Sequence, residues 1–417
     1  EESVSQSVLV RPPRMITSDR ALCHTIQRYY DALGRVQVDV CNEDLVTEEK
    51  HYGSEICRVT CSLKDGKDER TVSVILKEST LDKMINEAIE ENVHFTSELQ
   101  MYLEVLPCME RLCQDTFPDC EPLWPHCLGH MEDTKIVLED LKELGYKLTD
   151  RQTGMDYEHA SLSIRSLAKF HALSMALINN GTVSPGKFSK FVFGGDYSFM
   201  NDLSKNRFDT LLKAIKDSWS GEWKDVLERL GRLPSSAAEK VKEMRLQPCK
   251  WNVINHGDPW VNNIMFKYKK GTTSPESVRF VDYQLSHYGS FGFDLHYFIN
   301  TSLSIDLLPS TEKLLLEYTQ TLQEQMKHFG LKNIPTFHQV LDEMKRLEFF
   351  GLFTAVSITP IIIAPPELAP PRFNQDLPLE EIVSRNVERF RTEEYTRRIQ
   401  IILRRAQHGG FFERMCG

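Results

Sequence analysis

Hydrophobic and polar residues alternate along the N-terminal part of the chain, as they do in β-strands that bury one face. Four runs show this alternation or are strongly apolar: residues 36–40, 56–63, 71–77 and 135–138. Asp65-Gly66 separates the second run from the third. An Asp-Gly pair between two strand-like runs predicts a hairpin, because glycine adopts the positive φ of a tight turn. The pattern therefore predicts a small antiparallel sheet.

Apolar residues recur at helical spacing in most of the remaining chain. In the N-terminal part this predicts one helix over residues 18–33 and another over residues 81–106, which Pro107 ends. One short hairpin, residues 264–268 with residues 277–282, is predicted further on. The helices predicted around it cover residues 157–177, 207–230, 237–244, 311–329, 336–356 and 379–406.

The order of these elements predicts an α+β fold with two lobes. The first lobe, residues 1–138, is a small antiparallel sheet with one long helix, and the second, residues 139–417, is mostly helical. A chain of 417 residues, 41% of them hydrophobic, is long enough to bury a core in each lobe. The formal net charge of −10 argues against a nucleic-acid-binding surface, which needs clustered positive charge.

Neither a membrane span nor a targeting segment is expected. The most apolar stretch, residues 349–364, contains Gly351 and Pro360 and is shorter than the roughly 20 apolar residues of a spanning helix. The first six residues do not resemble a signal peptide. We therefore expect a cytoplasmic protein whose ten cysteines, which form no Cys-x-x-Cys pair, are reduced thiols. A metal site is a minor alternative at Cys108, Cys113, Cys120 and Cys127 with His126 and His130.

One motif in the second lobe carries the residues of a phosphoryl-transfer site. His256-Gly257-Asp258, followed by Asn263, fits the kinase loop His-x-Asp-x-x-x-x-Asn, in which the aspartate accepts or orients the acceptor proton and the asparagine holds a metal ion. Asp282 lies 24 residues beyond Asp258, where a kinase places its metal-binding aspartate. Two carboxylates in one cleft repel each other unless a divalent cation lies between them. The motif predicts ATP and Mg²⁺ as cofactors, Asp258 as the catalytic residue, and Asn263 and Asp282 as metal ligands.

The first lobe supplies candidate nucleotide contacts by position. Lys77 ends a predicted strand, where kinases place the lysine that pairs with phosphates, and Glu98 lies on the next helix, where the ion-pair partner of that lysine belongs. A solvated strand end for Lys77 and a solvated helix face for Glu98 are the alternatives. Gly53 and Ser54 precede the strand and predict a phosphate loop with a single glycine.

Three polar residues of the second lobe are expected to support the site. Asp294 lies among apolar residues and should accept N–H groups of the catalytic loop, because a buried carboxylate needs such partners. His256 is expected to be structural support within the motif. His171, on an apolar helix face, is expected to be a core histidine with satisfied partners.

The acceptor is expected to be a small molecule. Asp294 follows Asp282 by only 12 residue steps, and no Ala-Pro-Glu follows, so the chain has no room for the peptide platform of a protein kinase. Residues 192–248 contain aromatic side chains that either cap an apolar pocket over the acceptor or form ordinary helix core, and both readings stay open. These side chains are Phe193, Tyr197, Phe199, Trp219 and Trp223.

The motifs and their flanking blocks closely resemble the insect ecdysteroid kinase-like family, whose relatives are choline and aminoglycoside kinases. The resemblance implies a protein-kinase-like fold, ATP as donor, and a hydroxylated acceptor such as an ecdysteroid or a xenobiotic undergoing detoxification. It also implies that Glu139, Asp140 and Leu141 form the hinge beside the adenine. The nucleotide loop, with its one glycine, departs from the family pattern. The matching blocks are Phe95 to Pro107, Val137 to Asp150, Leu167 to Ala172, Asn255 to Asn263, Val281 to Gln284 and Phe293 to Ser302.

Two other functions stay open. A choline- or ethanolamine-type kinase needs an aromatic cage for a quaternary ammonium, and Trp260, Tyr283 and Tyr288 lie close enough in sequence to form one. A pseudokinase that binds a ligand without catalysis is suggested by the single glycine of the nucleotide loop.

Overall fold

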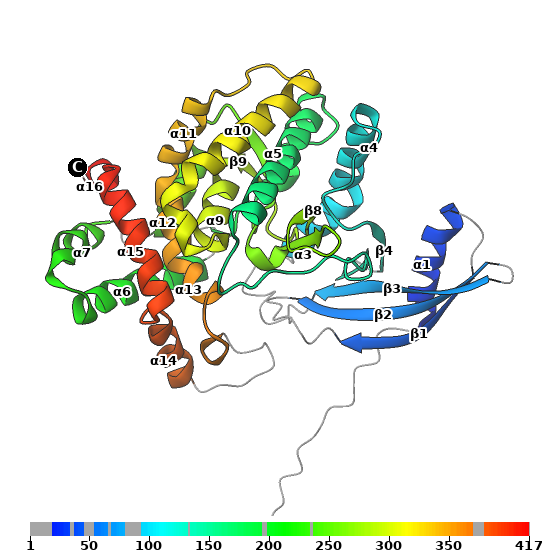
Figure 1. Cartoon of the computed structure of the whole chain (residues 1–417), viewed down its shortest axis with the longest axis horizontal. Coiled ribbons are helices and arrows are strands. Elements are labelled where there is room, and N and C mark those ends of the chain that lie inside the picture. Colours follow the sequence, from blue (N-terminus) through cyan, green and yellow to red (C-terminus); the bar gives the residue numbers. More distant parts are fainter. Residues whose placement is uncertain are drawn as a thin grey trace, which may run out of the picture. The chain divides into compact units, whose positions relative to one another are not determined.

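The computed structural model describes residues 19–33, 37–45, 54–65, 68–79, 93–131, 134–193, 198–233, 237–369 and 379–416 (Figure 1). The chain forms two compact units, a sheet unit of residues Glu1–Thr80 and His126–Asp140 and a helical unit of residues Leu81–Pro125 and Leu141–Gly417. Residues 81–125, which the sequence analysis assigned to the first lobe, thus belong to the helical unit. The predicted α+β class, with a small antiparallel sheet and a larger helical part, is confirmed.

The sheet unit is a five-stranded antiparallel sheet in the order β1-β2-β3-β5-β4. Its strands are β1 (Gln37–Leu45), β2 (Ser54–Asp65), β3 (Asp68–Ser79), β4 (Cys127–Met131) and β5 (Lys135–Glu139). β2 pairs with β3 until Asp65 lies opposite Asp68, which confirms the predicted hairpin. Helix α1 (Asp19–Leu33) contacts β1 and β4, and its Leu22 and Ile26 join the core of the sheet. The sequence did not predict β4, whose Gly129 interrupts the apolar pattern.

A continuous helical segment connects residues 93 to 116 in the helical unit. Helix α3 (Val93–Gln100) passes through a π-helical turn, Met101–Val105, into α4 (Leu106–Thr116). The prediction that Pro107 ends the helix is wrong. Pro107 lies in the first turn of α4, where the missing N–H of proline removes no bond of that helix. Helix α4 packs on α5 (Tyr157–Asn179), which explains why this segment belongs to the helical unit.

The helical unit is built around α5, α9 (Gly292–Ser302) and α10 (Thr311–His328), with α5 packed along α10 (Figure 1). The other helices are α6 (Ser198–Ser218), α7 (Lys224–Leu230), α8 (Ala237–Leu246), α11 (Phe337–Arg346), α12 (Glu348–Ser357), α13 (Thr359–Ile362), α14 (Leu379–Arg389), α15 (Glu393–His408) and α16 (Phe411–Cys416). Short 3-10 segments are η3 (Pro185–Phe188), η4 (Gly221–Trp223), η5 (Val261–Asn263), η6 (Ile305–Ser310) and η7 (Pro366–Leu368). Among the described residues, no helix has the length and apolar character needed to cross a membrane.

Two small antiparallel ribbons hold the chain around the predicted catalytic motif. β6 (Asn252–Asn255) pairs with β9 (His287–Ser290), and β7 (Ile264–Tyr268) pairs with β8 (Pro275–Phe280). The second ribbon was predicted, whereas β6 and β9 were not, because each has only four residues. The motif occupies the connection between β6 and β7.

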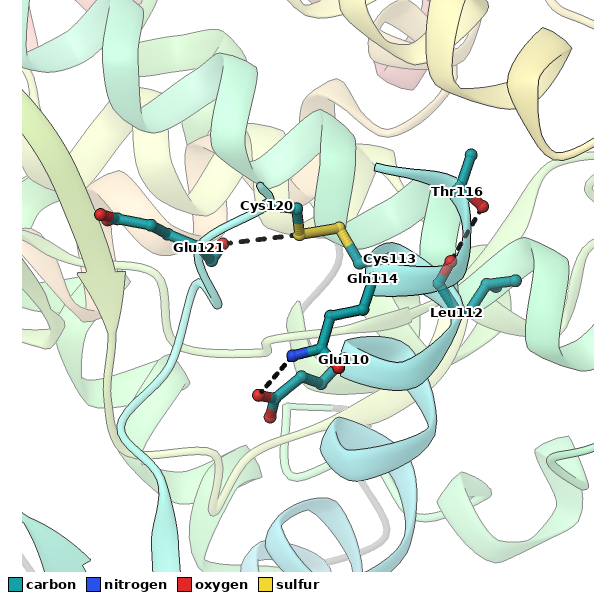
Figure 2. Close-up of a disulfide and its surroundings, with 7 residues drawn as sticks. All are labelled: Glu110, Leu112, Cys113, Gln114, Thr116, Cys120 and Glu121. Carbon is teal, nitrogen blue, oxygen red and sulfur yellow. Dashed lines mark hydrogen bonds between the residues drawn. A yellow bond between two sulfur atoms is a disulfide. The ribbon is translucent and has the colours of Figure 1, made fainter. Parts of the chain in front are cut away.

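Cys113 and Cys120 form a disulfide in the helical unit (Figure 2). Helix α4 ends at Thr116, and the N–H of Cys120 donates to the carbonyl oxygen of Phe117 at 2.9 Å, so that the chain turns back on itself. This turn brings the Cα atoms of the two cysteines to 6.4 Å. The expectation of reduced thiols is therefore wrong for this pair, because the sequence did not reveal where the helix ends. Within the described ranges, no group of three or more His, Cys, Asp or Glu side chains is arranged to hold a metal ion.

Candidate active site

The predicted catalytic motif lies in the turn after β6, and its glycine is required by the backbone. Gly257 has a φ of +88°, and a Cβ atom there would lie 1.9 Å from the carbonyl oxygen of Leu285. Only glycine tolerates both the positive φ and this close approach. After this tight turn, Asn263 at the end of η5 follows Asp258 by five positions in the sequence.

Asp294, on α9, holds the backbone of this turn. It is 0% exposed, and its carboxylate accepts the N–H groups of His256 at 2.7 Å and Gly257 at 2.9 Å. Its Oδ2 also lies 3.0 Å from Nε2 of His171 on α5. Burial alone would raise the pKa of Asp294, but the hydrogen bond and attraction of His171 outweigh it and hold the pKa below its ordinary value. His171 has both ring nitrogens satisfied, since Nδ1 lies 2.8 Å from the hydroxyl of Tyr318.

His256 links the turn to the strand end that carries Asp282. Its Nε2 lies 3.1 Å from the carbonyl oxygen of Val281, and its Nδ1 lies 3.3 Å from the backbone N–H of Asp258. A carbonyl accepts and an N–H donates, so the ring carries its proton on Nε2. Burial lowers the pKa of His256, which agrees with a neutral ring. The residue therefore ties two backbone segments together.

Asp258 and Asn263 are hydrogen-bonded to each other. Nδ2 of Asn263 donates to Oδ2 of Asp258 at 2.9 Å and to its backbone carbonyl oxygen at 3.0 Å. Asp258 is 9% exposed, and burial, followed by the negative charge of Asp282, raises the pKa of Asp258 to about 8. A carboxyl group with so high a proton affinity is well matched to accepting a proton near neutral pH.

Asp282 has a strained backbone and lies in the same site. Its φ is +69°, a region that non-glycine residues rarely occupy and that is enriched at functional sites. The N–H of Val281 donates to the carbonyl oxygen of Asn263 at 3.0 Å, which fixes the strand end beside the catalytic loop. The side chain of Asp282 is half-buried, with Nε2 of Gln284 at 3.5 Å from Oδ2.

The donor set of this site fits a hard divalent cation. Asp282 offers a carboxylate, and Asn263 offers its amide oxygen, because its amide nitrogen is already engaged with Asp258. Mg²⁺ binds to proteins through one or two such oxygen ligands together with substrate phosphates and water. A cation here would also offset the repulsion by which Asp282 raises the pKa of Asp258.

Lys77 and Glu98 are both buried and belong to different units. Lys77, on β3, is 3% exposed, and Glu98, on α3, is 0% exposed. The alternatives of a solvated strand end and a solvated helix face are therefore wrong. Ser54 is the first residue of β2, and Gly53 lies outside the described residues. The nucleotide contacts of these four residues stay predictions.

The predicted hinge residues lie where the chain passes between the units. Asp140 is 3% exposed, and its Oδ2 accepts a hydrogen bond from Nε of Arg58 at 2.6 Å. Oε2 of Glu139 accepts the N–H of His126 at 3.2 Å. Both carboxylates thus bind groups of the sheet unit, whereas Leu141 is buried at the start of the helical unit's second segment. The expected hinge contacts through backbone groups stay a prediction.

Tyr297 is a site residue that the sequence analysis missed. The residue is buried, and burial, followed by the negative charge of Asp258, raises the pKa of Tyr297 well above its ordinary value. It lies on α9 three residues after Asp294, and residues three apart lie on the same helix face. The signal was the spacing Asp-x-x-Tyr, which becomes visible only when residues 292–302 are read as a helix.

The aromatic residues of 192–248 are largely core. Phe193 and Trp223 are each 4% exposed, and the ring of Trp219 packs 4.9 Å from that of Trp223. The side chains of Tyr197 and Phe199 lie outside the described residues. The reading as ordinary core therefore holds for Phe193 and Trp223.

A cavity of about 1170 Å³ opens elsewhere in the helical unit, and none of its described lining residues belongs to the predicted catalytic motif. Ser304 lines it, and two residues earlier the Oγ of Ser302 donates to the carbonyl oxygen of Pro259, the neighbour of Asp258, at 3.3 Å. Its apolar lining includes Leu148, Met155, Tyr268, Ile305 and Ile363. Its carboxylates are Asp150, Asp156, Asp306 and Glu394. The sequence analysis named none of these residues as binding residues.

Comparisons with known proteins place the chain among kinase-like sequences. The family model described as the ecdysteroid kinase-like family matches residues 48–331. No curated protein shows significant similarity to the chain. Similar solved structures include a GDP complex of an aminoglycoside 2'-phosphotransferase of type IIIa, at 12% identity over 91% of this chain and 99% of that chain, with a TM-score of 0.37. A choline/ethanolamine kinase family protein from Mesorhizobium loti is similar at 12% identity over 82% and 89%, with a TM-score of 0.32. An amicoumacin kinase in complex with AMP-PNP, Ca²⁺ and Ami is similar at 12% identity over 85% and 90%, with a TM-score of 0.35.

Proposed function

We propose that this chain, which belongs to the ecdysteroid kinase-like family and is a small-molecule phosphotransferase, uses ATP as its phosphoryl donor. In this proposal the γ-phosphoryl group passes to a hydroxyl of an ecdysteroid or another hydroxylated metabolite. Mg²⁺ is the proposed metal cofactor. The main support for the proposal is that Asp258, Asn263 and Asp282 lie in one site. Asn263 donates to Asp258 through its side chain and accepts from the residue before Asp282 through its backbone.

The proposed reaction uses one carboxylate directly. Asp258 orients the acceptor hydroxyl and takes its proton as the oxygen bonds to the γ-phosphorus and the bond from that phosphorus to the leaving oxygen of ADP breaks. Asn263 and Asp282 would hold Mg²⁺, which neutralises charge on the phosphates when it is bound. His256 and Asp294 fix the backbone of the loop, so that Asp258 needs no rearrangement before reaction.

We assign the acceptor to this cavity, whose lining residue Ser304 lies two residues after Ser302, which is hydrogen-bonded to Pro259 of the loop. Its volume of about 1170 Å³ lies just above the range of about 300–1,000 Å³ that is usual for small-molecule sites, so it has room for a molecule of steroid size. Its apolar side chains would contact a ring system, and its carboxylates would accept hydrogen bonds from hydroxyl groups. This assignment supports a hydroxylated apolar acceptor such as a steroid or a plant-derived xenobiotic.

The structure disfavours the choline alternative. Tyr283, one of the three proposed cage residues, is 0% exposed, and its ring packs 4.6 Å from that of His256 and 5.6 Å from that of Tyr102. A cage needs ring faces that are open to the ligand. Trp260 and Tyr288 are half-buried, so only two of the three rings remain accessible to form a cage.

We place the reaction in the cytoplasm, where ATP is abundant. The disulfide between Cys113 and Cys120 is unusual for that compartment, in which glutathione and thioredoxin keep most thiols reduced. Fractionation of the source cells, with detection of the chain in each fraction, tests the location directly. Recovery of the chain from the secretory pathway alone would contradict it.

Incubation with ATP, Mg²⁺ and a panel of ecdysteroids, plant metabolites and choline tests the proposal. We expect an ecdysteroid or a plant metabolite to gain one phosphate by mass spectrometry, in an amount equal to the ADP formed. A ligand that binds only the native state raises its stability. A melting temperature that MgATP does not raise, together with no phosphate ester, would favour the pseudokinase instead.

A further inference from the structure

Three polar side chains that line the acceptor cavity are hydrogen-bonded to one another in a row. Asp156 is the N-cap of α5, His159 lies in the first turn of that helix, and Tyr268 is the last residue of β7. Oδ1 of Asp156 lies 2.7 Å from Nδ1 of His159, and Nε2 of His159 lies 3.1 Å from the hydroxyl of Tyr268. The row thus connects the start of a helix with the end of a strand.

Contacts from both elements hold the ring of His159. Its backbone N–H donates to Oδ1 of Asp156 at 3.0 Å, so the capping carboxylate binds both the backbone and the ring of one residue. On β7, the ring of Phe266 meets that of His159 edge-on, with the centroids 4.8 Å apart. His159 is 8% exposed, whereas Tyr268 is half-buried. The hydroxyl of Tyr268 is therefore bound to a fixed ring, on a residue that is itself open to the cavity.

The charge of Asp156 sets the direction of the bonds in this row. Burial would raise the pKa of Asp156, but the hydrogen bonds from His159 outweigh it and hold the pKa below its ordinary value. The ionised carboxylate only accepts, so Nδ1 of His159 carries a proton. Nε2 of the neutral ring is then unprotonated, and the hydroxyl of Tyr268 donates its one proton to it. What the oxygen of Tyr268 offers to the cavity is a lone pair.

Other hydroxyls of the cavity lining are engaged in the same sense. Those of Thr153, Thr272 and Thr392 donate to backbone carbonyl oxygens at 3.3, 3.0 and 3.0 Å. A carbonyl oxygen only accepts, so these hydroxyls have no second proton for a ligand. The four carboxylates among the described lining residues are acceptors as well. The described lining is therefore rich in acceptors and suits a molecule that supplies donors.

We propose that the oxygen of Tyr268 is a specificity-determining hydrogen-bond acceptor, which selects a molecule with a hydroxyl rather than a ketone at the position facing it. A ketone there would bring its lone pairs against that of Tyr268. His159 and Asp156 are positioning residues, because they act on the ligand only through Tyr268. The inference rests on the proposed function, which assigns the acceptor to this cavity. β7 begins at Ile264, directly after Asn263, so the strand that presents Tyr268 starts at the catalytic loop.

The test is binding in the absence of nucleotide, measured by isothermal titration calorimetry. The probes are an ecdysteroid and matched analogues in which one hydroxyl at a time is replaced by a ketone. We expect one analogue to bind the wild type about 3- to 10-fold more weakly than the parent, as for the loss of one hydrogen bond between neutral groups. Tyr268→Phe should bind the parent as weakly as the wild type binds that analogue, with no further loss for the analogue itself.

His159→Phe provides a readout that a purely structural role would not move. Phenylalanine keeps a ring beside Phe266 but removes the group that accepts the proton of Tyr268, so this proton becomes available to the cavity. The hydroxyl of Tyr268 then donates to a ketone, and the analogue should bind at least as tightly as the parent. A general loss of cavity shape would weaken both ligands equally.

Tyr157→Phe is the matched control. Tyr157 lies two residues before His159 on α5, and its hydroxyl donates to Glu317, which is not among the described lining residues. This variant should bind both ligands as the wild type does. Wild-type affinity for the parent in Tyr268→Phe, or an unchanged preference for the hydroxyl in His159→Phe, overturns the inference. A wild-type protein that binds none of the probes overturns it as well.

The failure of the proposed function has a different signature. These binding measurements need neither ATP nor turnover, so the expected preference is observable in a protein that forms no phosphate ester with MgATP. That combination contradicts the proposed transfer and leaves the inference intact. Phosphate transfer to the ecdysteroid, with equal affinity of the wild type for the parent and every analogue, contradicts the inference and leaves the proposed function intact.

Discussion

The backbone carbonyl oxygen of Asn263 accepts the N–H of Val281 at 3.0 Å, and this bond joins the two segments that carry the proposed metal ligands. Val281 directly precedes Asp282, while the side chain of Asn263 donates to Asp258. The proposed base and both proposed metal ligands are therefore coupled through one residue. Changes at Asn263 should affect metal dependence and turnover together.

Asn263→Ala tests this coupling. The substitution removes the amide that donates to Asp258 and the proposed Mg²⁺ ligand, but it keeps the backbone bond to Val281. We expect kcat to fall at least about 10-fold, since a hydrogen bond to a charged group is lost, and half-maximal activity to require more Mg²⁺. Steady-state kinetics against Mg²⁺ at saturating ATP measure both effects. Asn206→Ala, on the exposed face of α6, is the control, and an unchanged Mg²⁺ dependence in Asn263→Ala contradicts the assigned role.

Gly257→Ala should destabilise the fold strongly. Gly271→Ala separates the cost of the positive φ from the cost of the close contact with Leu285. Both glycines have positive φ, +88° and +74°, but a Cβ at Gly271 meets nothing within 4 Å, whereas one at Gly257 would lie 1.9 Å from the carbonyl oxygen of Leu285. We expect Gly271→Ala to cost about 1 kcal/mol and Gly257→Ala more than about 3 kcal/mol in the free energy of unfolding. Urea denaturation measures both. Equal losses would show that the close approach to Leu285 is relieved at no cost.

Acid should destabilise the protein through His287. Burial lowers the pKa of His287 to about 4, against about 6.5 in the unfolded chain. The folded state therefore holds the neutral ring and binds fewer protons than the unfolded state between these values. Stability is full above pH 6.5 and falls as the pH drops toward 4, by about 3 kcal/mol for this one group.

His287→Phe should reduce the slope of the free energy of unfolding against pH, between about pH 4 and 6.5, by the equivalent of about one bound proton. The ring of His287 packs 4.4 Å from that of Phe191, so phenylalanine can occupy the site. Urea denaturation of both proteins between pH 7 and pH 4 gives the two slopes. His338→Phe, at an exposed position, should leave the slope of the wild type, and a slope unchanged in His287→Phe as well refutes the prediction.

The disulfide between Cys113 and Cys120 should contribute to stability. A loop this short is expected to contribute about 2 kcal/mol by restricting the unfolded chain. Cys113→Ser should therefore lower the melting temperature, and dithiothreitol should lower that of the wild type but not that of the variant. Cys108→Ser, on the same helix, is the control and should keep the response to reductant. Alkylation of all ten cysteines in unreduced, denatured wild-type protein would contradict the bond.

Ile305→Trp should obstruct the acceptor cavity. Ile305 lines the cavity near Ser304, and a larger side chain there takes up volume that the acceptor needs. We expect the KM for the acceptor to rise about 10-fold or more while the KM for ATP stays unchanged, because one lost set of apolar contacts is worth about 1–3 kcal/mol. Thr210→Trp, in a separate groove on α6, is the matched control. A KM for the acceptor that stays at the wild-type value would place the acceptor elsewhere.

The main residues of the proposed site could be predicted from local sequence. Asp258 and Asn263 lie within one short loop, so their spacing already fixed how they meet, and a single predicted hairpin was enough to connect them with Asp282. The supporting role of Asp294 could also be predicted, because a carboxylate among apolar residues needs hydrogen-bonding partners. The two-part fold followed from the change between strand and helix periodicity.

The features that the sequence did not reveal depend on contacts between distant segments. β6 and β9 are four residues each and form only because they pair across the loop. Tyr297 shares a face of α9 with Asp294 through the register of the helix, and the disulfide depends on the residue at which α4 ends. Pro107 was read as a stop, although the π-helical turn before it lets a new helix begin there. Such features become visible only when the helix boundaries are known.

The most direct test of the account is phosphate transfer by the wild type and by Asp258→Asn, measured with radiolabelled ATP, Mg²⁺ and an ecdysteroid. The amide has the size of the carboxylate but cannot accept the proton. We predict a labelled ester for the wild type and a rate at least about 100-fold lower for Asp258→Asn, with unchanged melting temperature and nucleotide affinity. Wild-type turnover in Asp258→Asn would contradict the role of the carboxylate on which the account depends.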